Sequence, residues 1–315
     1  MSLILQKISR RQVLIGALGA GAAGASVPAR AAKDALSFVV IGDWGRRGAE
    51  HQAEVARQMG ETAAAIGSRF VISAGDNFYE NGVQSLDDSH WRQSFEDIYA
   101  APSLQTPWHV ILGNHDYRGN VAPQLAYGTR SPRWKMPARY FSRTETLADG
   151  SAADFFFLDT SPFIRAYRGT AVRIDGQDTA AQLAWLDRAL GESRTPWKIV
   201  IGHHPLYTAL GGAHHDQPDL IAPLAPLLLR HRVPVYINGH DHSMQYVEID
   251  GIAYVTTGAG SETYDTGPAS RPGFANGAHG FLRAALRPDT LDIAFVTERG
   301  EEPFRRTIPR QGKAG

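Results

Sequence analysis

Five short apolar segments of this sequence each end in a glycine that is followed at once by a side chain able to bind a metal ion. In chain order the motifs are GDWG from residue 42, GDNFY from residue 75, GNHD from residue 113, GHH from residue 202 and GHDH from residue 239. In an open α/β sheet, ligands collect outside the carboxyl ends of the strands, and glycine lets the backbone approach a ligand closely. We therefore expect these loops to converge on one site, although they span roughly 200 residues.

Apolar segments rich in Val, Ile and Phe alternate with longer polar stretches of helical composition, which predicts an α/β fold. Strands are predicted at residues 36–41, 69–74, 108–112, 154–159, 197–201 and 233–238, and helices at residues 49–67, 178–190 and 219–230. Pro223 and Pro226 disturb the last helical pattern. From about residue 244 the sequence reads as successive strands joined by short turns, which is typical of antiparallel pairing. No repeat or linker divides residues 33–315, so we expect a single domain.

The N-terminal residues are typical of an export signal. Lys7, Arg10 and Arg11 precede a weakly apolar run at residues 13–27, and Ala29, Arg30 and Ala31 follow as a small-residue site. The stretch SRRQVL resembles the twin-arginine signal, which implies export of the folded protein by the twin-arginine machinery. A membrane anchor is the alternative, but the run falls short of the ~20 apolar residues that span a bilayer. We predict a twin-arginine-type signal peptide at residues 1–32, and a soluble mature protein that is periplasmic or secreted.

Composition excludes several kinds of chemistry. The 315 residues include no cysteine, so disulfides, zinc-thiolate clusters and cysteine nucleophiles are all excluded. The 32 Lys and Arg residues balance 32 Asp and Glu residues, so the formal net charge of 0 gives no electrostatic reason to expect nucleic acid or an anionic membrane as a partner. Any affinity for phosphate has to come from a local site.

Each motif taken alone has a structural explanation as well as a functional one. Asp43 or Asp76 after a strand could form a turn or cap a helix, and His115 or His204 could be a buried histidine with its hydrogen bonds satisfied. His240 and His242 are harder to explain in that way, because alternation places both imidazoles on one side of an extended segment. Five such strand ends in one chain favour a site.

The donors in these loops suit two metal ions. Two aspartates, one asparagine, three histidines and a tyrosine supply enough oxygen and nitrogen ligands if one carboxylate bridges the ions. Two ions about 3.5–4 Å apart are the usual arrangement for phosphoryl hydrolysis, where they hold substrate oxygens and generate hydroxide near neutral pH. The sequence has neither a G-x-S-x-G nucleophile elbow nor a G-x-x-x-x-G-K-[ST] phosphate loop.

The ordered motif set resembles the calcineurin-like metallophosphoesterases, and specifically the purple acid phosphatases. The likeness is closest to the small, animal-type tartrate-resistant acid phosphatases and extends over about residues 38–310, including FEDIYAAPSLQTPWHVILGNHDYRGNV and YINGHDHSMQY. This resemblance implies the fold class α/β, a metallophosphoesterase β-sandwich of two mixed sheets flanked by helices (α/β/β/α) in a single catalytic domain at residues 33–315. The metal site is then expected at the strand ends.

The same resemblance implies a role for each motif residue. It implies that Asp43, Tyr79 and His242 bind Fe(III), that Asn114, His203 and His240 bind a divalent ion, which would be Fe(II), Zn(II) or Mn(II), and that Asp76 bridges the two ions. His115 is expected to meet the substrate phosphate and to help protonate the leaving group. A second histidine of that kind is assigned to His214, with the adjacent His215 as the alternative.

We expect a secreted, monomeric acid phosphatase that hydrolyses small phosphate monoesters by attack of metal-bound hydroxide. The alternatives are a phosphodiesterase or nucleotide pyrophosphatase of the same superfamily, and a non-catalytic protein that binds phosphate or metal. The roles of several neighbouring residues stay open at this stage. His204 either packs, faces solvent or alters substrate preference; Arg46, Arg47 and Arg118 either attract phosphate or are solvated surface charges; and Trp44, Phe78 and Trp91 either wall the cleft or belong to the core.

Overall fold

The computed structural model describes residues 34–211, 216–267 and 269–311. The predicted signal peptide at residues 1–32 lies outside these residues, so its prediction stays untested.

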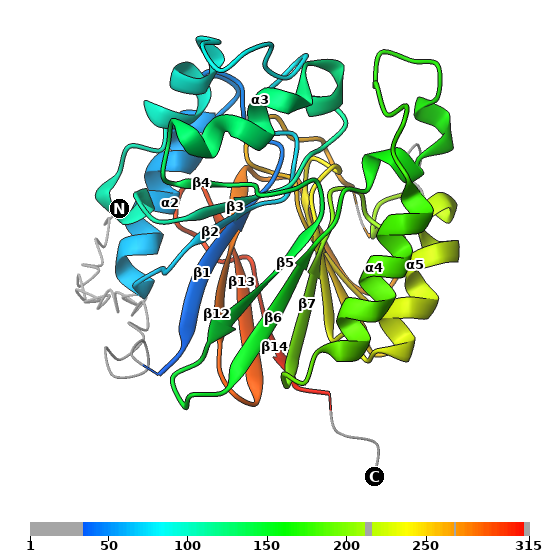
Figure 1. Cartoon of the computed structure of the whole chain (residues 1–315). Helices are drawn as coiled ribbons and strands as arrows, with labels where there is room; N and C mark the ends of the chain where they lie inside the picture. The colour runs from blue at the N-terminus through cyan, green and yellow to red at the C-terminus, as the bar shows by residue number, and fades with distance from the viewer. Residues whose placement is uncertain (1–33, 212–215, 268, 312–315) are drawn as a thin grey trace, which may run out of the picture.

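Two seven-stranded mixed sheets pack face to face, and helices cover their outer faces (Figure 1). The first sheet has the strand order β14-β13-β12-β1-β2-β3-β4, and the second has the order β11-β9-β10-β8-β7-β6-β5. This arrangement confirms the predicted fold class, an α/β sandwich of two mixed sheets flanked by helices in a single domain.

The strands of the first sheet are β1 (Leu36–Ile41), β2 (Val71–Ser73), β3 (Trp108–Val110), β4 (Trp134–Lys135), β12 (Gly280–Leu286), β13 (Thr290–Thr297) and β14 (Phe304–Pro309). Those of the second sheet are β5 (Phe141–Thr146), β6 (Ala152–Phe157), β7 (Trp197–Ile201), β8 (Val235–Asn238), β9 (Met244–Ile249), β10 (Ile252–Thr257) and β11 (Phe274–Asn276). The α-helices are α2 (Gln52–Ile66), α3 (Val121–Ala126), α4 (Thr179–Glu192) and α5 (Pro218–Arg230).

Strand β1 shows why the predicted strands are apolar along their whole length. Phe38 and Val40 point into the core between the two sheets, whereas Val39 and Ile41 point into the layer that α2 covers. Successive side chains of a strand point to opposite faces, so a strand that is covered on both faces has no polar alternation. Helix α2 contributes Val55, Met59 and Ala63 to its layer, at the four-residue spacing of a single helical face.

Helix α5 continues through Pro223 and Pro226, although these residues disturb the helical pattern in the sequence. Each internal proline removes a backbone hydrogen bond and costs a helix about 3 kcal/mol. Leu220, Leu224 and Leu228 are buried in the layer that α4 and α5 form against the second sheet. This burial offsets the cost of the prolines, and Figure 1 shows both helices side by side on that sheet.

Sequence reasoning missed three strands. Strand β5 lies at the edge of the second sheet with most of its side chains exposed or half-buried, so it lacks the apolar signature used for the other strands. Strand β4 has two residues and β11 has three, which is too short for a periodic pattern. The antiparallel pairing expected after residue 244 is confirmed for β9 with β10, β12 with β13 and β13 with β14.

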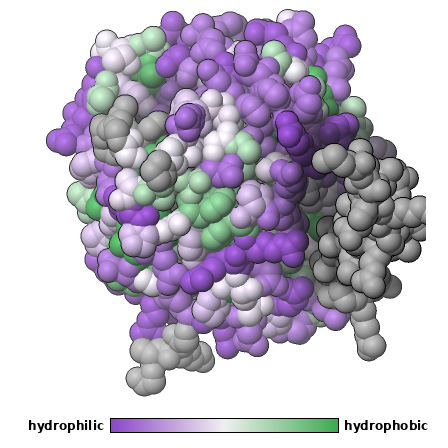
Figure 2. Space-filling view, turned by 180° about the vertical axis from the view of Figure 1, so that it is seen from behind, coloured by the Kyte–Doolittle hydropathy of each residue, from purple (hydrophilic) through white to green (hydrophobic). Residues whose placement is uncertain are grey.

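The topology brings the motif loops together. Strands β1, β2 and β3 are parallel neighbours in the first sheet, and β6, β7 and β8 are parallel neighbours in the second. Their carboxyl ends therefore meet at the same end of the sandwich, as expected for an α/β ligand site. Seen from behind, the surface is largely hydrophilic with scattered small apolar patches (Figure 2). Among the described residues, no helix is both long enough and apolar enough to cross a bilayer.

Candidate metal centre

The predicted ligands of the two sheets lie in one cluster. The first sheet supplies Asp43 after β1, Asp76 and Tyr79 after β2 and Asn114 after β3, and the second sheet supplies His203 after β7 and His240 and His242 after β8. All are buried except His240, which is partly exposed. These polar residues are far apart in the sequence, yet they occupy one site that has little access to water.

Three of these residues have a strained backbone. Asp43, Asp76 and His240 lie in the left-handed region with φ angles of 60°, 51° and 69°. Residues other than glycine rarely adopt this conformation, because it costs free energy. Such strain is found mostly at functional sites, where the surrounding structure enforces it.

Two glycines are required by the close approach of backbone to carboxylate. A Cβ atom on Gly113 would lie 2.2 Å from Asp76 Oδ1, and one on Gly239 would lie 2.4 Å from Asp43 Oδ2. Both distances are below any real contact, so no other residue fits at either position without movement of the carboxylate. The glycines therefore make room for the carboxylates, and the predicted approach of the backbone to a ligand stays a prediction.

The phenol of Tyr79 lies at the centre of one half of the cluster. Its hydroxyl oxygen lies 3.0 Å from Asp43 Oδ1, 3.1 Å from Asp76 Oδ2 and 2.9 Å from His242 Nε2. One hydroxyl proton cannot serve both carboxylate oxygens at once. The phenol oxygen, two carboxylate oxygens and an imidazole nitrogen thus lie close together, which suits a bound cation.

His203 organises the other half. Its Nδ1 lies 2.8 Å from the carbonyl oxygen of Ala74, which can only accept a hydrogen bond, so Nδ1 carries the proton. Its Nε2 faces Asn114 Oδ1 at 3.2 Å and Asp76 Oδ2 at 3.4 Å. Asn114 Oδ1 and Asp76 Oδ2 thus converge on one nitrogen of His203, and Asp76 belongs to both halves.

The pKa values reflect this crowding. Burial raises the pKa of Asp43 well above its usual value, whereas the pKa of Asp76 is lowered because the nearby His203 outweighs the effect of burial. Burial alone would lower the pKa of His203, but the carboxylate of Asp76 raises it to about 9. A proton on Nε2 of His203 takes the place that a metal ion would otherwise fill, since protons and metal ions compete for imidazole.

Burial keeps the other two histidines neutral. It lowers the pKa of His240 to about 4 and that of His242 to about 3. The neutral imidazole is the form that binds a metal ion. The donor set of carboxylates, a phenol, an amide and neutral imidazoles therefore fits two cations that share Asp76.

His115 lies beside this cluster with its ring partly exposed. Its backbone N–H donates to Asp76 Oδ1 at 2.7 Å, and its Nδ1 lies 2.7 Å from the carbonyl oxygen of Glu80. Arg118 Nη1 lies 3.1 Å from the same Nδ1, so the chain engages Nδ1 and leaves Nε2 to give or take a proton. Burial lowers the pKa of His115, although Asp76 opposes the effect.

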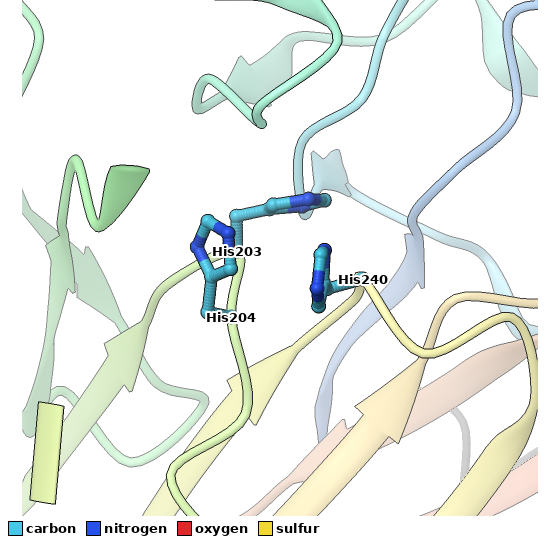
Figure 3. Close-up of side chains that lie close together, drawn as sticks. All are labelled: His203, His204 and His240. Carbon is cyan, nitrogen blue, oxygen red and sulfur yellow. The ribbon is translucent and has the colours of Figure 1, made fainter. Parts of the chain in front are cut away.

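His204 packs rather than binding metal. One of its ring nitrogens lies within 4.8 Å of those of His203 and His240, and Figure 3 shows the three imidazoles at the ends of two neighbouring strands. Both nitrogens of His204 are engaged, however: Nδ1 lies 2.9 Å from Thr160 Oγ1 and Nε2 lies 2.9 Å from Tyr167 Oη. His204 is buried, so the solvent-facing alternative left open by the sequence is wrong, and an effect on substrate preference stays a prediction.

The structure also places the three aromatic residues whose role the sequence left open. Trp44, Phe78 and Trp91 are buried in the layer under α2, so they belong to the core. Residues 212–215 lie outside the described part of the chain, so His214 and its alternative His215 stay sequence-based predictions.

Sequence reasoning missed two supporting residues. Thr160 Oγ1 accepts hydrogen bonds from the backbone N–H groups of His203 and His204, both at 3.1 Å. Asp116 accepts from the backbone N–H of Gly113 at 2.9 Å and from Asn77. The available signal was that Thr160 directly follows the predicted strand 154–159 and that Asp116 completes the GNHD motif.

Comparisons with known proteins agree with this geometry. Residues 36–244 match the model of the calcineurin-like phosphoesterase family. Purple acid phosphatase 4 of Arabidopsis thaliana is 38% identical over 283 residues, which cover 84% of this chain and 81% of the relative. Tartrate-resistant acid phosphatase type 5 of Oryctolagus cuniculus is 32% identical over 311 residues, covering 91% of this chain and 94% of the relative.

Among solved structures, GAP50, described as the anchor in the inner membrane complex of Plasmodium, superimposes with a TM-score of 0.77 at 26% identity. The match covers 89% of this chain and 90% of that structure.

Proposed function

This chain belongs to the calcineurin-like phosphoesterase family and, within it, to the purple acid phosphatases, and from that premise we propose that it hydrolyses phosphate monoesters outside the cytoplasm with Fe(III) and a divalent ion. It is a hydrolase, an acid phosphatase, and its family implies a binuclear metal centre that contains iron. The observation that carries the finer proposal is the convergence of Asp43, Asp76 and His242 on the hydroxyl of Tyr79.

The two halves of the cluster suit different ions. Asp43, Tyr79 and His242 would hold Fe(III), because phenolate and carboxylate are hard anionic donors that favour a trivalent ion. Asn114, His203 and His240 would hold Fe(II), Zn(II) or Mn(II), because an amide and two imidazoles suit a divalent ion. Asp76 is within 3.5 Å of donors in both halves, which supports its role as the bridging ligand.

Two bound ions would supply the positive charge that holds phosphate oxygens and acidifies an attacking water molecule. The buried residues around the ions would keep the donors fixed and exclude bulk water. The electrostatic attraction between the ions and the substrate would then be screened less than in water. No covalent protein nucleophile is needed in this proposal, in line with the absence of cysteine and of a nucleophile elbow from the sequence.

His115 would handle the proton of the leaving group. Its Nδ1 is engaged by the carbonyl oxygen of Glu80 and by Arg118 Nη1, which leaves Nε2 as the exchanging atom. The lowered pKa of this histidine means that it gives up a proton readily in the acid range. His214 stays our prediction for a second histidine of this kind, with His215 as the alternative.

The decisive test combines elemental analysis, visible absorption and kinetics on the purified protein. We expect iron together with a divalent metal, a visible charge-transfer band, and faster hydrolysis of a phosphate monoester than of a diester in the acid range. In Tyr79→Phe the band should vanish, whereas Tyr207→Phe, which changes a tyrosine away from the cluster, should keep it. A colourless protein that holds only zinc and prefers diesters near neutral pH would instead support the phosphodiesterase alternative.

Export is the remaining part of the proposal. The twin-arginine-type sequence at residues 1–32 supports transport of the folded protein by the twin-arginine machinery to the periplasm or the outside, leaving a monomeric catalytic domain at residues 33–315. Replacement of both Arg10 and Arg11 by Lys should leave the unprocessed protein in the cytoplasm, as cell fractionation and N-terminal sequencing would show. Unchanged export of that double variant would refute this route.

A further inference from the structure

Arg46 lies directly on the ring of Tyr79. It follows the GDWG motif, and its guanidinium carbon is 3.9 Å from the centroid of the phenol ring. A guanidinium within about 6 Å of a ring centroid interacts with the π-electrons of that ring. The hydroxyl of the same ring faces Asp43, Asp76 and His242, so Arg46 contacts the proposed iron ligand without touching the other donors named here.

Three further contacts fix this position. Arg46 Nη1 lies 2.7 Å from Glu80 Oε1, Nη2 lies 2.5 Å from Glu262 Oε2, and Nε lies 3.3 Å from Ser261 Oγ. Every nitrogen of the guanidinium thus has a partner within the chain. Of the two alternatives that the sequence left for Arg46, the low exposure of its side chain excludes a solvated surface charge, and attraction of phosphate stays a prediction.

The neighbouring arginines lie elsewhere. Arg47 Nε contacts Gln93 Oε1 at 3.2 Å on the exposed side of the same loop, and Arg118 Nη1 lies 3.1 Å from His115 Nδ1. Neither has a recorded contact with the ring of Tyr79. Among the arginines of the described metal loops, Arg46 is the one placed to act on that ring.

Burial makes the charge of Arg46 effective. Its side chain is 12% exposed, whereas those of Glu80 and Glu262 are 59% and 49% exposed. Water therefore screens the two carboxylates more strongly than the guanidinium. The guanidinium, 3.9 Å from the centroid of the Tyr79 ring, is therefore the less screened charge of this group.

We propose that Arg46 tunes the iron half of the centre through the ring of Tyr79. This inference rests on the proposed function, because it requires Tyr79 to bind Fe(III). A cation beside the phenolate stabilises the negative charge of the ring. Light absorption by such a pair moves an electron from the ring toward the metal and away from Arg46, so the guanidinium moves the visible band to shorter wavelength.

The charge of Arg46 also affects the reduction of Fe(III), which it makes easier. When an external reductant delivers one electron to Fe(III), the net charge near Arg46 becomes less positive, so the guanidinium favours the reduced state and raises the reduction potential. Loss of Arg46 should therefore move the band to longer wavelength and lower the potential together. A change that only makes the iron a weaker electron acceptor, by contrast, would pair a lower potential with a shorter wavelength, because the electron is then harder to add by either route.

The test is a set of four variants of the purified holoenzyme. Arg46→Gln removes the charge and should move the band to longer wavelength and lower the potential in a dithionite titration, with iron content unchanged. Arg46→Lys keeps the charge and should stay close to the wild type. Glu262→Gln removes a compensating carboxylate and should give a smaller shift to shorter wavelength. Arg47→Gln is the matched control from the same loop and should change neither quantity.

The outcomes separate this inference from the proposed function. A wild-type protein without iron or without a visible band refutes both. A coloured, iron-containing wild type whose band and potential do not change in Arg46→Gln refutes the tuning role alone and leaves Arg46 as a structural residue of the loop. If Arg46→Gln fails to fold or to bind iron, Glu262→Gln decides: a shift to shorter wavelength supports the inference, and an unchanged or red-shifted band overturns it.

Discussion

The two sheets contribute different chemistry to one site. The loops of the first sheet supply oxygen donors, namely Asp43, Asp76, Tyr79 and Asn114, and the loops of the second sheet supply nitrogen donors, namely His203, His240 and His242. Neither set is complete without the other, since Tyr79 lies 2.9 Å from His242 and Asn114 lies 3.2 Å from His203. Because each sheet supplies a different kind of donor, the site lies at the interface of the two sheets and belongs to neither sheet alone.

The largest expected effect comes from Asp76, the oxygen donor that faces both halves of the cluster. Asp76→Asn removes the charge that faces both Tyr79 and His203, so both ions should be lost, together with the colour and about 10³-fold of kcat/KM. Elemental analysis and monoester hydrolysis measure this. Asp187→Asn, an exposed change on α4, is the control. Retention of both ions in Asp76→Asn would show that the carboxylate does not bridge them.

A smaller loss is expected on the nitrogen side. His240→Ala should reduce affinity for the divalent ion while leaving the Tyr79 half intact, so the protein should keep its iron and its visible band but lose activity by about 10²-fold. Excess Zn(II) or Mn(II) should restore part of that activity. Disappearance of the band in this variant would mean that the two halves cannot be loaded separately.

Removal of both ions should weaken the junction of the sheets. An ion that binds only the folded protein, at about 1,000 times its dissociation constant, stabilises it by about 4 kcal/mol, so two ions contribute about 8 kcal/mol, which corresponds to roughly 16 °C in Tm for a chain of this size. Dialysis against a chelator and a reductant, followed by thermal melting, measures the change. Asp76→Asn should melt at the same temperature with and without this treatment, and a large shift in that variant would point to another stabilising ion.

The smallest expected effect is on stability at acid pH, and it comes from a buried histidine outside the metal cluster. His109, on β3, lies beside Phe70 and Phe157, its Nε2 has no hydrogen-bond partner among the described residues, and burial lowers its pKa to about 3. The unfolded chain binds a proton near pH 6.5 while the folded chain stays neutral, so stability falls as pH drops from about 6.5 toward 3.

At pH 4.5 this histidine should cost about 2 to 3 kcal/mol relative to neutral pH. His109→Leu removes that cost, so its free energy of unfolding should exceed that of the wild type at pH 4.5 and differ little at pH 7.5. Denaturant unfolding at both pH values measures the difference. An equal effect at the two pH values would assign the change to packing and not to protonation.

The sequence predicted much of this arrangement because the relevant signals are local. Glycine followed by Asp, Asn or His at a strand end marks where backbone and metal-capable side chain meet, and the alternation of His240 and His242 places them together. Edge strand β5 was missed because its side chains are largely exposed. The packing of His204 against Thr160 and Tyr167, and the contact of Arg46 with Tyr79, depend on loops that meet only in three dimensions, so no sequence pattern encodes them.

The hydrogen bond between His203 Nδ1 and the carbonyl of Ala74 gives the site a further property. It joins the end of β7 to the end of β2, across the two sheets, and it also fixes which nitrogen of His203 is free for a metal. A chain with misdocked sheets lacks this alignment and cannot assemble either half of the centre. If the cluster binds iron as we propose, metal uptake requires correctly docked sheets, and the colour of a preparation should report the fraction of molecules that are correctly folded.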